Sequence, residues 1–147
     1  TQNRIPAGKL KNVGTSAAVL SELVKRLIEH LGQWCIEKVI LSKQPDFIEK
    51  NQIILDADKV GNIVLRYWKA GDRFSPRGIN GSKKLARVMR DLHISAGERR
   101  IWPLVADENH IYWIAFLRGS NYGLPDKNTK KYLLITLKKE NREDEES

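Results

Sequence analysis

Apolar residues recur at helical spacing in one stretch near the N-terminus. They are Leu20, Leu23, Val24, Leu27, Ile28 and Leu31. Residues three and four apart share one face of an α-helix, and Thr15 or Ser16 supplies a suitable N-cap. We therefore predict an amphipathic helix here, with an apolar stripe more typical of core packing than of a partner-binding face. The next apolar positions, Trp34 to Ile40, fit either a second helix or a strand.

Short β-type runs replace the helical spacing after Pro45. They cover residues 53–55, 63–68, 104–106, 111–117 and 132–137, with turn residues such as Gly61-Asn62 between them. Runs of this length, rich in β-branched and aromatic residues and separated by turns, are typical of antiparallel strands. Asp107-Glu108-Asn109 joins two of the runs, so we expect a hairpin there. Trp102 and Trp113 are assigned to the core, where strand aromatics usually pack.

Two further helices are predicted between these runs. Ser82 is a good N-cap, and apolar residues at helical spacing follow it up to Leu92. Ser95-Ala-Gly-Glu98 matches a capping box, which predicts a second helical turn. Before them, residues 70–81 are rich in Gly, Pro, Asp and Asn and are expected to form a long loop.

These elements define the expected fold class and domain organisation. The fold class is α+β, with an antiparallel sheet and two short basic helices preceded by the amphipathic helical segment. Residues 1–50 are expected to form a helical linking segment, residues 51–137 a C-terminal domain, and residues 138–147 a disordered tail. This tail has the sequence KKENREDEES, which carries mixed charge without apolar periodicity. Because the chain of 147 residues opens with Thr1, we expect it to be a piece of a longer protein.

Positive charge is concentrated in one quarter of the chain. The formal net charge is +8, and the stretch from Arg66 to Arg100 holds ten Lys or Arg against three acidic residues. Lysines and arginines that neutralise phosphates release condensed counterions, which favours binding to nucleic acids. The charge pattern therefore indicates a polyanion as partner.

Several classes of chemistry lack the residues they need. Cys35 is the single cysteine and the three histidines lie far apart, so neither a disulfide nor a zinc site is expected. Cys35 is interpreted as a small packing residue beside Trp34. Asp56 and Asp58 lie two apart, but we identify no further carboxylates to join them, which favours a turn and capping role over metal or acid-base chemistry. No apolar run approaches the roughly 20 residues of a bilayer span, and we expect a cytoplasmic protein without membrane contact.

The most informative stretch places two lysines at the predicted start of the Ser82 helix. A helix N-terminus presents unpaired N–H groups and partial positive charge, which suit a phosphate, while Lys83 and Lys84 are unfavourable there without an anion. A solvated basic helix is the alternative. The loop lacks the spacing of a phosphate-binding P-loop, and the chain has no pyrophosphate loop of the Ser-Gly-Gly-x-Asp-Ser type. We expect no catalytic residues, metal site or cofactor in this chain.

These residues resemble the C-terminal domain of the tRNA(Ile)-lysidine synthetases across about Ile54 to Leu137. The motifs are LDADK from Leu55, LRYWKAGDRFSPRGINGSKKL from Leu65, ERRIWPLV from Glu98, IYWIAFLR from Ile111 and NTKKYLLI from Asn128. Tyr67-Trp68 and Asn121-Tyr122-Gly123 depart from the family pattern.

The resemblance implies a noncatalytic, tRNA-binding portion of an ATP-dependent ligase that attaches lysine to the wobble cytidine of an isoleucine tRNA. ATP and magnesium would belong to a catalytic pyrophosphate-loop domain that this chain lacks, so whether the chain counts as an enzyme stays open. The implied partner is the acceptor-stem region of tRNA. By carry-over, the contacts fall on Arg73, Arg77, Ser82, Lys83, Lys84, Arg87 and Arg99. The alternative is an RNA-binding or protein-interaction module of the same fold with no link to lysidine synthesis.

Overall fold

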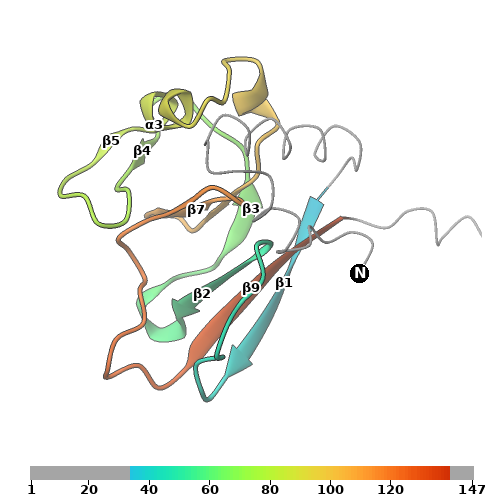
Figure 1. The fold of residues 1–147 in the computed structure, drawn as a ribbon, viewed down its shortest axis with the longest axis vertical. Helices are drawn as coiled ribbons and strands as arrows, with labels where there is room; N and C mark the ends of the chain where they lie inside the picture. Colours follow the sequence, from blue (N-terminus) through green and yellow to red (C-terminus); the bar gives the residue numbers. More distant parts are fainter. Residues whose placement is uncertain (1–33, 140–147) are drawn as a thin grey trace, which may run out of the picture.

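A computed structural model describes residues 34–139, which form three small sheets and one short α-helix. The sheets lie one above another along the long axis of the molecule (Figure 1). A three-stranded sheet occupies one end, a four-stranded sheet lies in the middle, and a two-stranded hairpin with helix α3 occupies the other end. Antiparallel sheets were predicted and are confirmed.

The three-stranded sheet has the C-terminal strand in its centre. Strand β9 (Tyr132–Lys139) pairs with β1 (Trp34–Leu41) on one side and β2 (Gln52–Asp56) on the other. The sequence left helix and strand open for the first of these, and the pairing of Trp34 with Lys139 makes it a strand. The described part of the expected helical linking segment thus contains β1. Residues 138 and 139, predicted to begin a disordered tail, are the end of β9.

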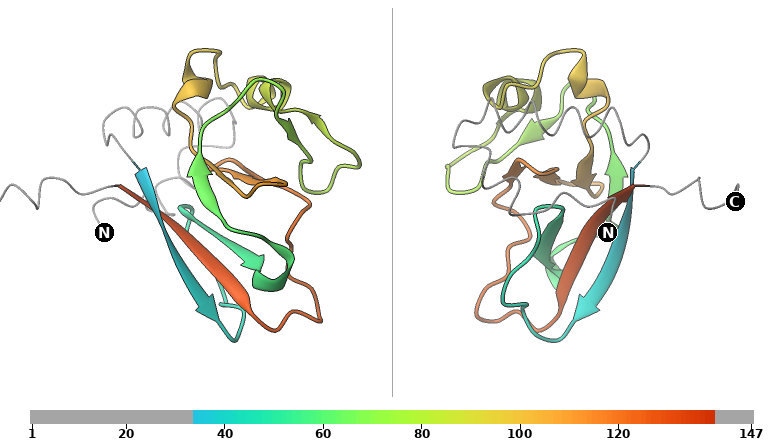
Figure 2. Two further views of the ribbon diagram at one scale, coloured as in Figure 1. Left: turned by 180° about the vertical axis from the view of Figure 1, so that it is seen from behind. Right: turned by 45° about the vertical axis from the view of Figure 1, so that its right-hand side comes forward.

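The four-stranded sheet carries most of the core. Its order is β3 (Val64–Arg66), β6 (Leu104–Ala106), β7 (Ile111–Ile114) and β8 (Arg118–Gly119). Every residue of β6 and β7 is buried, because other layers cover both faces of this sheet (Figure 2). Strands buried on both sides read as continuous apolar runs instead of alternating ones. The predicted hairpin of β6 and β7 is confirmed.

The predicted positions of the two basic helices need correction. Strand β4 (Arg73–Phe74) lies within the expected long loop and pairs with β5 (Lys83–Lys84), so helix α3 (Leu85–Asp91) begins after the lysines. Its buried residues, Leu85, Val88 and Met89, match the predicted apolar face. The second helix is a single 3₁₀ turn, η2 (Glu98–Arg100). The capping box is nevertheless present, since Ser95 N donates to Glu98 Oε1 and Glu98 N to Ser95 Oγ.

Burial confirms most of the expected core and corrects one residue. Trp102 is fully buried and donates its indole N–H to the carbonyl of Ala115, and Trp113 is buried as well. Cys35, interpreted as a packing residue, is exposed on β1, because alternate residues of a strand face opposite sides and its neighbour Trp34 takes the inner side. Asp56 caps the 3₁₀ turn η1 (Ala57–Lys59) by accepting from Asp58 N, as predicted.

Two expectations fall on residues that the structure does not describe. The amphipathic helix of residues 20–31 and the tail beyond residue 139 both lie outside the described range. Within residues 34–139, no helix is long and apolar enough to cross a bilayer.

Candidate nucleic-acid interface

The β4–β5 hairpin brings several of the predicted contact residues together. Arg73 donates from Nε to Ser82 Oγ at 2.9 Å and from Nη2 to the Ser82 carbonyl at 3.0 Å. Arg73 and Lys84 are directly opposite in the ladder, so their side chains share one face of the hairpin. Arg73, Ser82 and Lys84 therefore form one exposed group.

Ser82 does not cap helix α3. Its hydroxyl accepts from Arg73, while the first helical N–H, that of Leu85, donates to the carbonyl of Asp72 at 2.8 Å. The N-cap position belongs to Lys84, whose side chain makes no capping bond. The phosphate site predicted at the helix N-terminus is thus replaced by a strand that carries lysines.

The two lysines of β5 point in different directions. Successive side chains of a strand lie on opposite faces. Lys84 shares the face of Arg73, whereas Lys83 is opposite the buried Phe74 and lines a small cleft together with Arg118. The sequence placed both lysines at the start of a helix, and this placement is wrong, because they form strand β5 and lie on its opposite faces.

Among residues 34–139, the positive side chains of this hairpin form no ion pair with an acidic side chain. The ion pairs of residues 34–139 involve Lys59, Arg66 and Lys138, and none involves Arg73, Lys83 or Lys84. Like charges directly opposite in a ladder destabilise it. The arrangement of Arg73 across from Lys84 is therefore one that an anionic ligand would stabilise.

An ion pair fixes the base of the hairpin. Arg66 binds both carboxylate oxygens of Asp72, at 2.9 and 3.1 Å, and the N–H of Lys69 donates to the same carboxylate at 2.8 Å. Burial of Asp72 works against its charge, but the hydrogen bonds from Arg66 and Lys69 and their positive charges prevail and lower its pKa. The Arg66 guanidinium therefore positions the loop before β4 through its ion pair with Asp72.

Asn121 holds the long loop between β4 and β5. Its side-chain amide donates to the carbonyls of Pro76 at 2.9 Å and Ile79 at 2.7 Å, and its Oδ1 accepts from Gly78 N. The Arg77 backbone N–H also donates to the Gly119 carbonyl. Arg77 is thus presented on an ordered loop. Nothing in the local sequence indicated this role for Asn121.

The remaining predicted contacts lie on the helical elements. Arg87 is exposed on α3, next to the hairpin. Arg99 belongs to η2, where its guanidinium lies over the Trp68 ring at 5.1 Å from the centroid. Stacking of this kind stabilises the cation on the ring. The structure therefore groups Arg73, Ser82, Lys83, Lys84 and Arg87 on adjoining elements, with Arg77 on the connecting loop and Arg99 on a separate turn.

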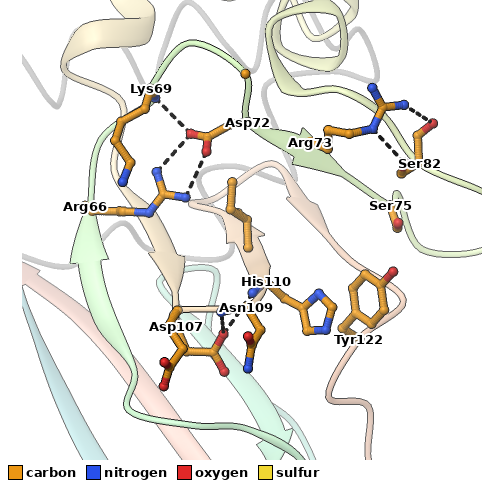
Figure 3. Close-up of a pocket in the computed structure, with 13 residues that line it drawn as sticks. Arg66, Lys69, Asp72, Arg73, Ser75, Ser82, Asp107, Asn109, His110 and Tyr122 are labelled. Atoms are coloured by element: carbon orange, nitrogen blue, oxygen red, sulfur yellow. Dashed lines mark hydrogen bonds and ion pairs between the residues drawn. The ribbon is translucent and has the colours of Figure 1, made fainter.

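A polar cleft of about 400 Å³ opens beside the hairpin (Figure 3). Its cationic side includes Arg66, Lys69 and Arg73, and its other side includes His110 and Tyr122. Below them, Asp107 accepts from Tyr112 Oη at 2.6 Å and from three backbone N–H groups, those of Gly61, Asn109 and His110. Sequence reasoning did not predict this cleft, because its walls come from segments far apart in the chain.

The arrangement suits binding of an anion. Within residues 34–139, His, Cys, Asp and Glu side chains do not form a group of three or more able to hold a metal ion. The exposed cationic side chains and the ordered loop are instead the features that position a phosphate backbone.

Comparison with known proteins gives a consistent family. The family described as the TilS substrate C-terminal domain matches residues 63–135. The tRNA(Ile)-lysidine synthase of Caldanaerobacter subterraneus subsp. tengcongensis is 40% identical over 115 residues, covering 77% of this chain and 25% of that protein. The synthase of Clostridium acetobutylicum is 40% identical over 92 residues, covering 62% of this chain and 20% of that protein. The chain thus spans a quarter or less of the length of these relatives.

A solved structure shows the same fold. The crystal structure of a TilS C-terminal domain superposes with a TM-score of 0.62 at 24% identity, covering 74% of this chain and 85% of that one. The fold, the matched segment and the relatives agree with the motifs of the β4–β5 region. Through residues 63–135, the chain belongs to the family of TilS substrate C-terminal domains.

Proposed function

We propose that this chain is the tRNA-binding portion of a tRNA(Ile)-lysidine synthase and that the β4–β5 hairpin holds the RNA backbone. The observation that carries the proposal is the like-charge pair of Arg73 and Lys84, exposed on one face without an acidic partner among residues 34–139. A phosphate placed between them replaces repulsion with two charge-assisted contacts.

The hairpin contacts the sugar-phosphate backbone of the RNA and recognises the shape of the stem instead of its base sequence. Side chains cannot enter the deep, narrow major groove of an A-form stem, so a protein binds it through phosphates and 2′-hydroxyls. Arg77 on its ordered loop, Arg87 on α3 and Lys83 on the opposite face of β5 extend the surface to neighbouring phosphates. Arg99 acts from η2, where Trp68 supports its guanidinium. The proposed target is the acceptor-stem region of tRNA.

In the proposed parent enzyme, a domain outside this chain carries out the reaction on the tRNA. Relatives of this chain are named for lysidine synthesis, and the chain corresponds to a quarter or less of their length. We assign the use of ATP and magnesium to a catalytic domain outside these residues. The role of the present residues is to hold the tRNA while that domain acts.

Replacing Lys84 tests this proposal directly. Lys84→Ala removes one member of the like-charge pair, so the chain should keep its stability or gain a few tenths of a kcal/mol. Affinity for tRNA, measured by titration at fixed salt, should fall because a phosphate contact is lost. The loss should be similar for cognate and noncognate tRNA, since such contacts carry no direct sequence information.

Lys127→Ala is the matched control. Lys127 is an exposed lysine in the loop before β9, remote in sequence from the hairpin, and its removal changes the net charge by the same amount. We expect its tRNA affinity to stay close to that of the unaltered chain. If Lys84→Ala and Lys127→Ala weaken binding equally, net charge rather than the hairpin explains the affinity, and the proposed interface is wrong.

A further inference from the structure

The cleft beside the hairpin has an aromatic side that the backbone contacts do not use. His110, from the turn between β6 and β7, and Tyr122, from the loop after β8, stack with ring centroids 3.7 Å apart and planes at 14°. Both rings line the cleft, and Tyr122 is 40% exposed. The two side chains lie side by side in Figure 3, with Ser75 between Tyr122 and Ser82. An exposed ring already ordered by stacking offers a surface for another flat ring at little further entropic cost.

The opposite side of the same cleft is cationic. Arg66, Lys69 and Arg73 line it, together with the hydroxyl-bearing residues Ser75 and Ser82. A cleft that places aromatic rings across from basic and hydroxyl groups combines the two features that bind single-stranded nucleic acid: stacking for the base and positive charge for the phosphate. Its volume of about 400 Å³ falls in the range of roughly 300–1,000 Å³ that is typical of small-ligand pockets.

The acidic residues of the cleft do not oppose such a ligand equally. Asp72 is paired with Arg66 through two contacts. The Asp107 carboxylate receives four hydrogen bonds, from Tyr112 and three backbone N–H groups. Glu108 is exposed at the cleft and forms no ion pair among the described residues. The cleft thus carries three cationic and three acidic side chains. Lys69 and Arg73 form no ion pair among the described residues, so they are the cations available to a phosphate.

We propose that this cleft binds an unpaired nucleotide of the bound RNA, with the base stacked on the His110–Tyr122 pair and its phosphate beside Arg73 and Lys69. The inference rests on the proposed function and deepens it. A paired base presents its faces to its neighbours in the helix, so an aromatic side chain reaches a free base face where the strand is single. In a tRNA bound through its acceptor stem, the unpaired nucleotides next to that stem are those of the 3′ end.

The test combines a change in the protein with a change in the RNA. Two tRNAs are titrated with the 147-residue chain: an intact one and the same tRNA without its unpaired 3′ nucleotides. The protein variants are Tyr122→Ala, which removes the ring, and Tyr122→Phe, which keeps it. Tyr67→Ala is the matched control, because Tyr67 is exposed to a similar extent, 45% against 40%, and does not line the cleft.

We expect Tyr122→Ala to bind intact tRNA about 10-fold more weakly than the unaltered chain, the size of loss expected when one base loses its stacking partner. Tyr122→Phe and Tyr67→Ala should bind intact tRNA like the unaltered chain. The truncated tRNA should bind the unaltered chain and Tyr122→Ala with equal affinity, since the stacked nucleotide is missing from both complexes. Thermal unfolding of each variant verifies that the fold is kept.

Two results would overturn the inference. In the first, Tyr122→Ala binds intact tRNA as tightly as the unaltered chain. In the second, Tyr122→Ala loses the same affinity for truncated tRNA as for intact tRNA, which places the contact on another part of the RNA. Failure of the proposed function is seen separately, as an absence of tRNA binding by the unaltered chain. Failure of the inference alone leaves that binding in place, but Tyr122→Ala then has no effect on it or has the same effect with and without the 3′ nucleotides.

Discussion

At the scale of single residues, Asp107 is a buried carboxylate that accepts four hydrogen bonds. It fixes the turn between β6 and β7 and ties Gly61 to it at 2.8 Å. Burial alone would raise the pKa of Asp107, but the hydrogen bonds from Tyr112 and the backbone N–H groups of Gly61, Asn109 and His110 outweigh it and lower the pKa to about 2. Burial raises the pKa of Tyr112, and the hydrogen bond to Asp107 and the charge of that carboxylate raise it further. The charged carboxylate therefore stabilises the wall of the cleft that carries His110.

This pKa predicts how stability depends on pH. The pKa of Asp107 in the folded chain, about 2, lies below its ordinary value of 3.8. Its charged form therefore stabilises the fold fully above pH 4, and this contribution is lost as the pH falls from about 4 to 2. A difference of nearly two pH units corresponds to roughly 2 kcal/mol in the free energy of unfolding.

Urea unfolding of the unaltered chain and of Asp107→Asn, at pH values between 2 and 7, measures this contribution. The variant should be less stable at pH 7, and the stability difference between the two proteins should shrink between pH 4 and pH 2. A stability difference that stays constant over that interval would show that Asp107 does not titrate as described.

At the scale of elements, glycine conformation fixes the loop that carries Tyr122. Gly123 has a φ of +70°, and a Cβ added there would lie 3.0 Å from Tyr112 Cε1 and from Val60 Cγ1. Its carbonyl accepts from Asp56 N at 2.8 Å, which joins this loop to the end of β2. An L side chain at this position meets both a disfavoured backbone conformation and two packed neighbours.

Gly123→Ala should therefore destabilise the chain by about 1–3 kcal/mol, of which roughly 1–2 kcal/mol comes from the left-handed conformation. Gly97→Ala is the matched control. Gly97 has a φ of −67°, and a Cβ added there meets nothing within 4 Å, so alanine should be neutral or stabilise by up to about 1 kcal/mol through the unfolded state. Thermal unfolding of both variants measures the difference. Equal melting temperatures would contradict the described loop geometry.

The helix start shows what local sequence predicts and what it does not. The spacing of Leu85, Val88 and Met89 predicted the buried face of α3, and the capping box at Ser95 was predicted correctly. The prediction of Ser82 as the N-cap was wrong, because its hydroxyl accepts a hydrogen bond from Arg73 and β5 pairs with β4. Both contacts bridge about ten residues of loop, and a capping preference contains no information about them.

At the scale of the whole molecule, the contacts that decide the architecture join the two ends of the described chain. Strand β1 pairs with β9 from Trp34↔Lys139 to Leu41↔Tyr132, and hydrophobic spacing alone left β1 undecided between helix and strand. The motifs from Leu65 to Leu85 fall within the segment that the family of TilS substrate C-terminal domains matches. The cleft was not predicted, because His110 and Tyr122 meet through the pairing of β7 with β8. The sequence shows where basic residues lie along the chain, whereas strand pairing determines which aromatic rings lie across the cleft from them.

The salt dependence of tRNA binding tests the central claim most directly. If the hairpin neutralises phosphates, the logarithm of the binding constant should fall linearly with the logarithm of salt concentration, with a slope of magnitude about 0.7–0.9 per phosphate contact. The unaltered chain should therefore lose affinity steeply between 50 and about 200 mM salt. Lys84→Ala should reduce the magnitude of that slope by about 1, while Lys127→Ala leaves it unchanged. A binding constant that does not change with salt, or a slope that Lys84→Ala leaves intact, would contradict the assignment of the β4–β5 hairpin as the RNA-binding surface.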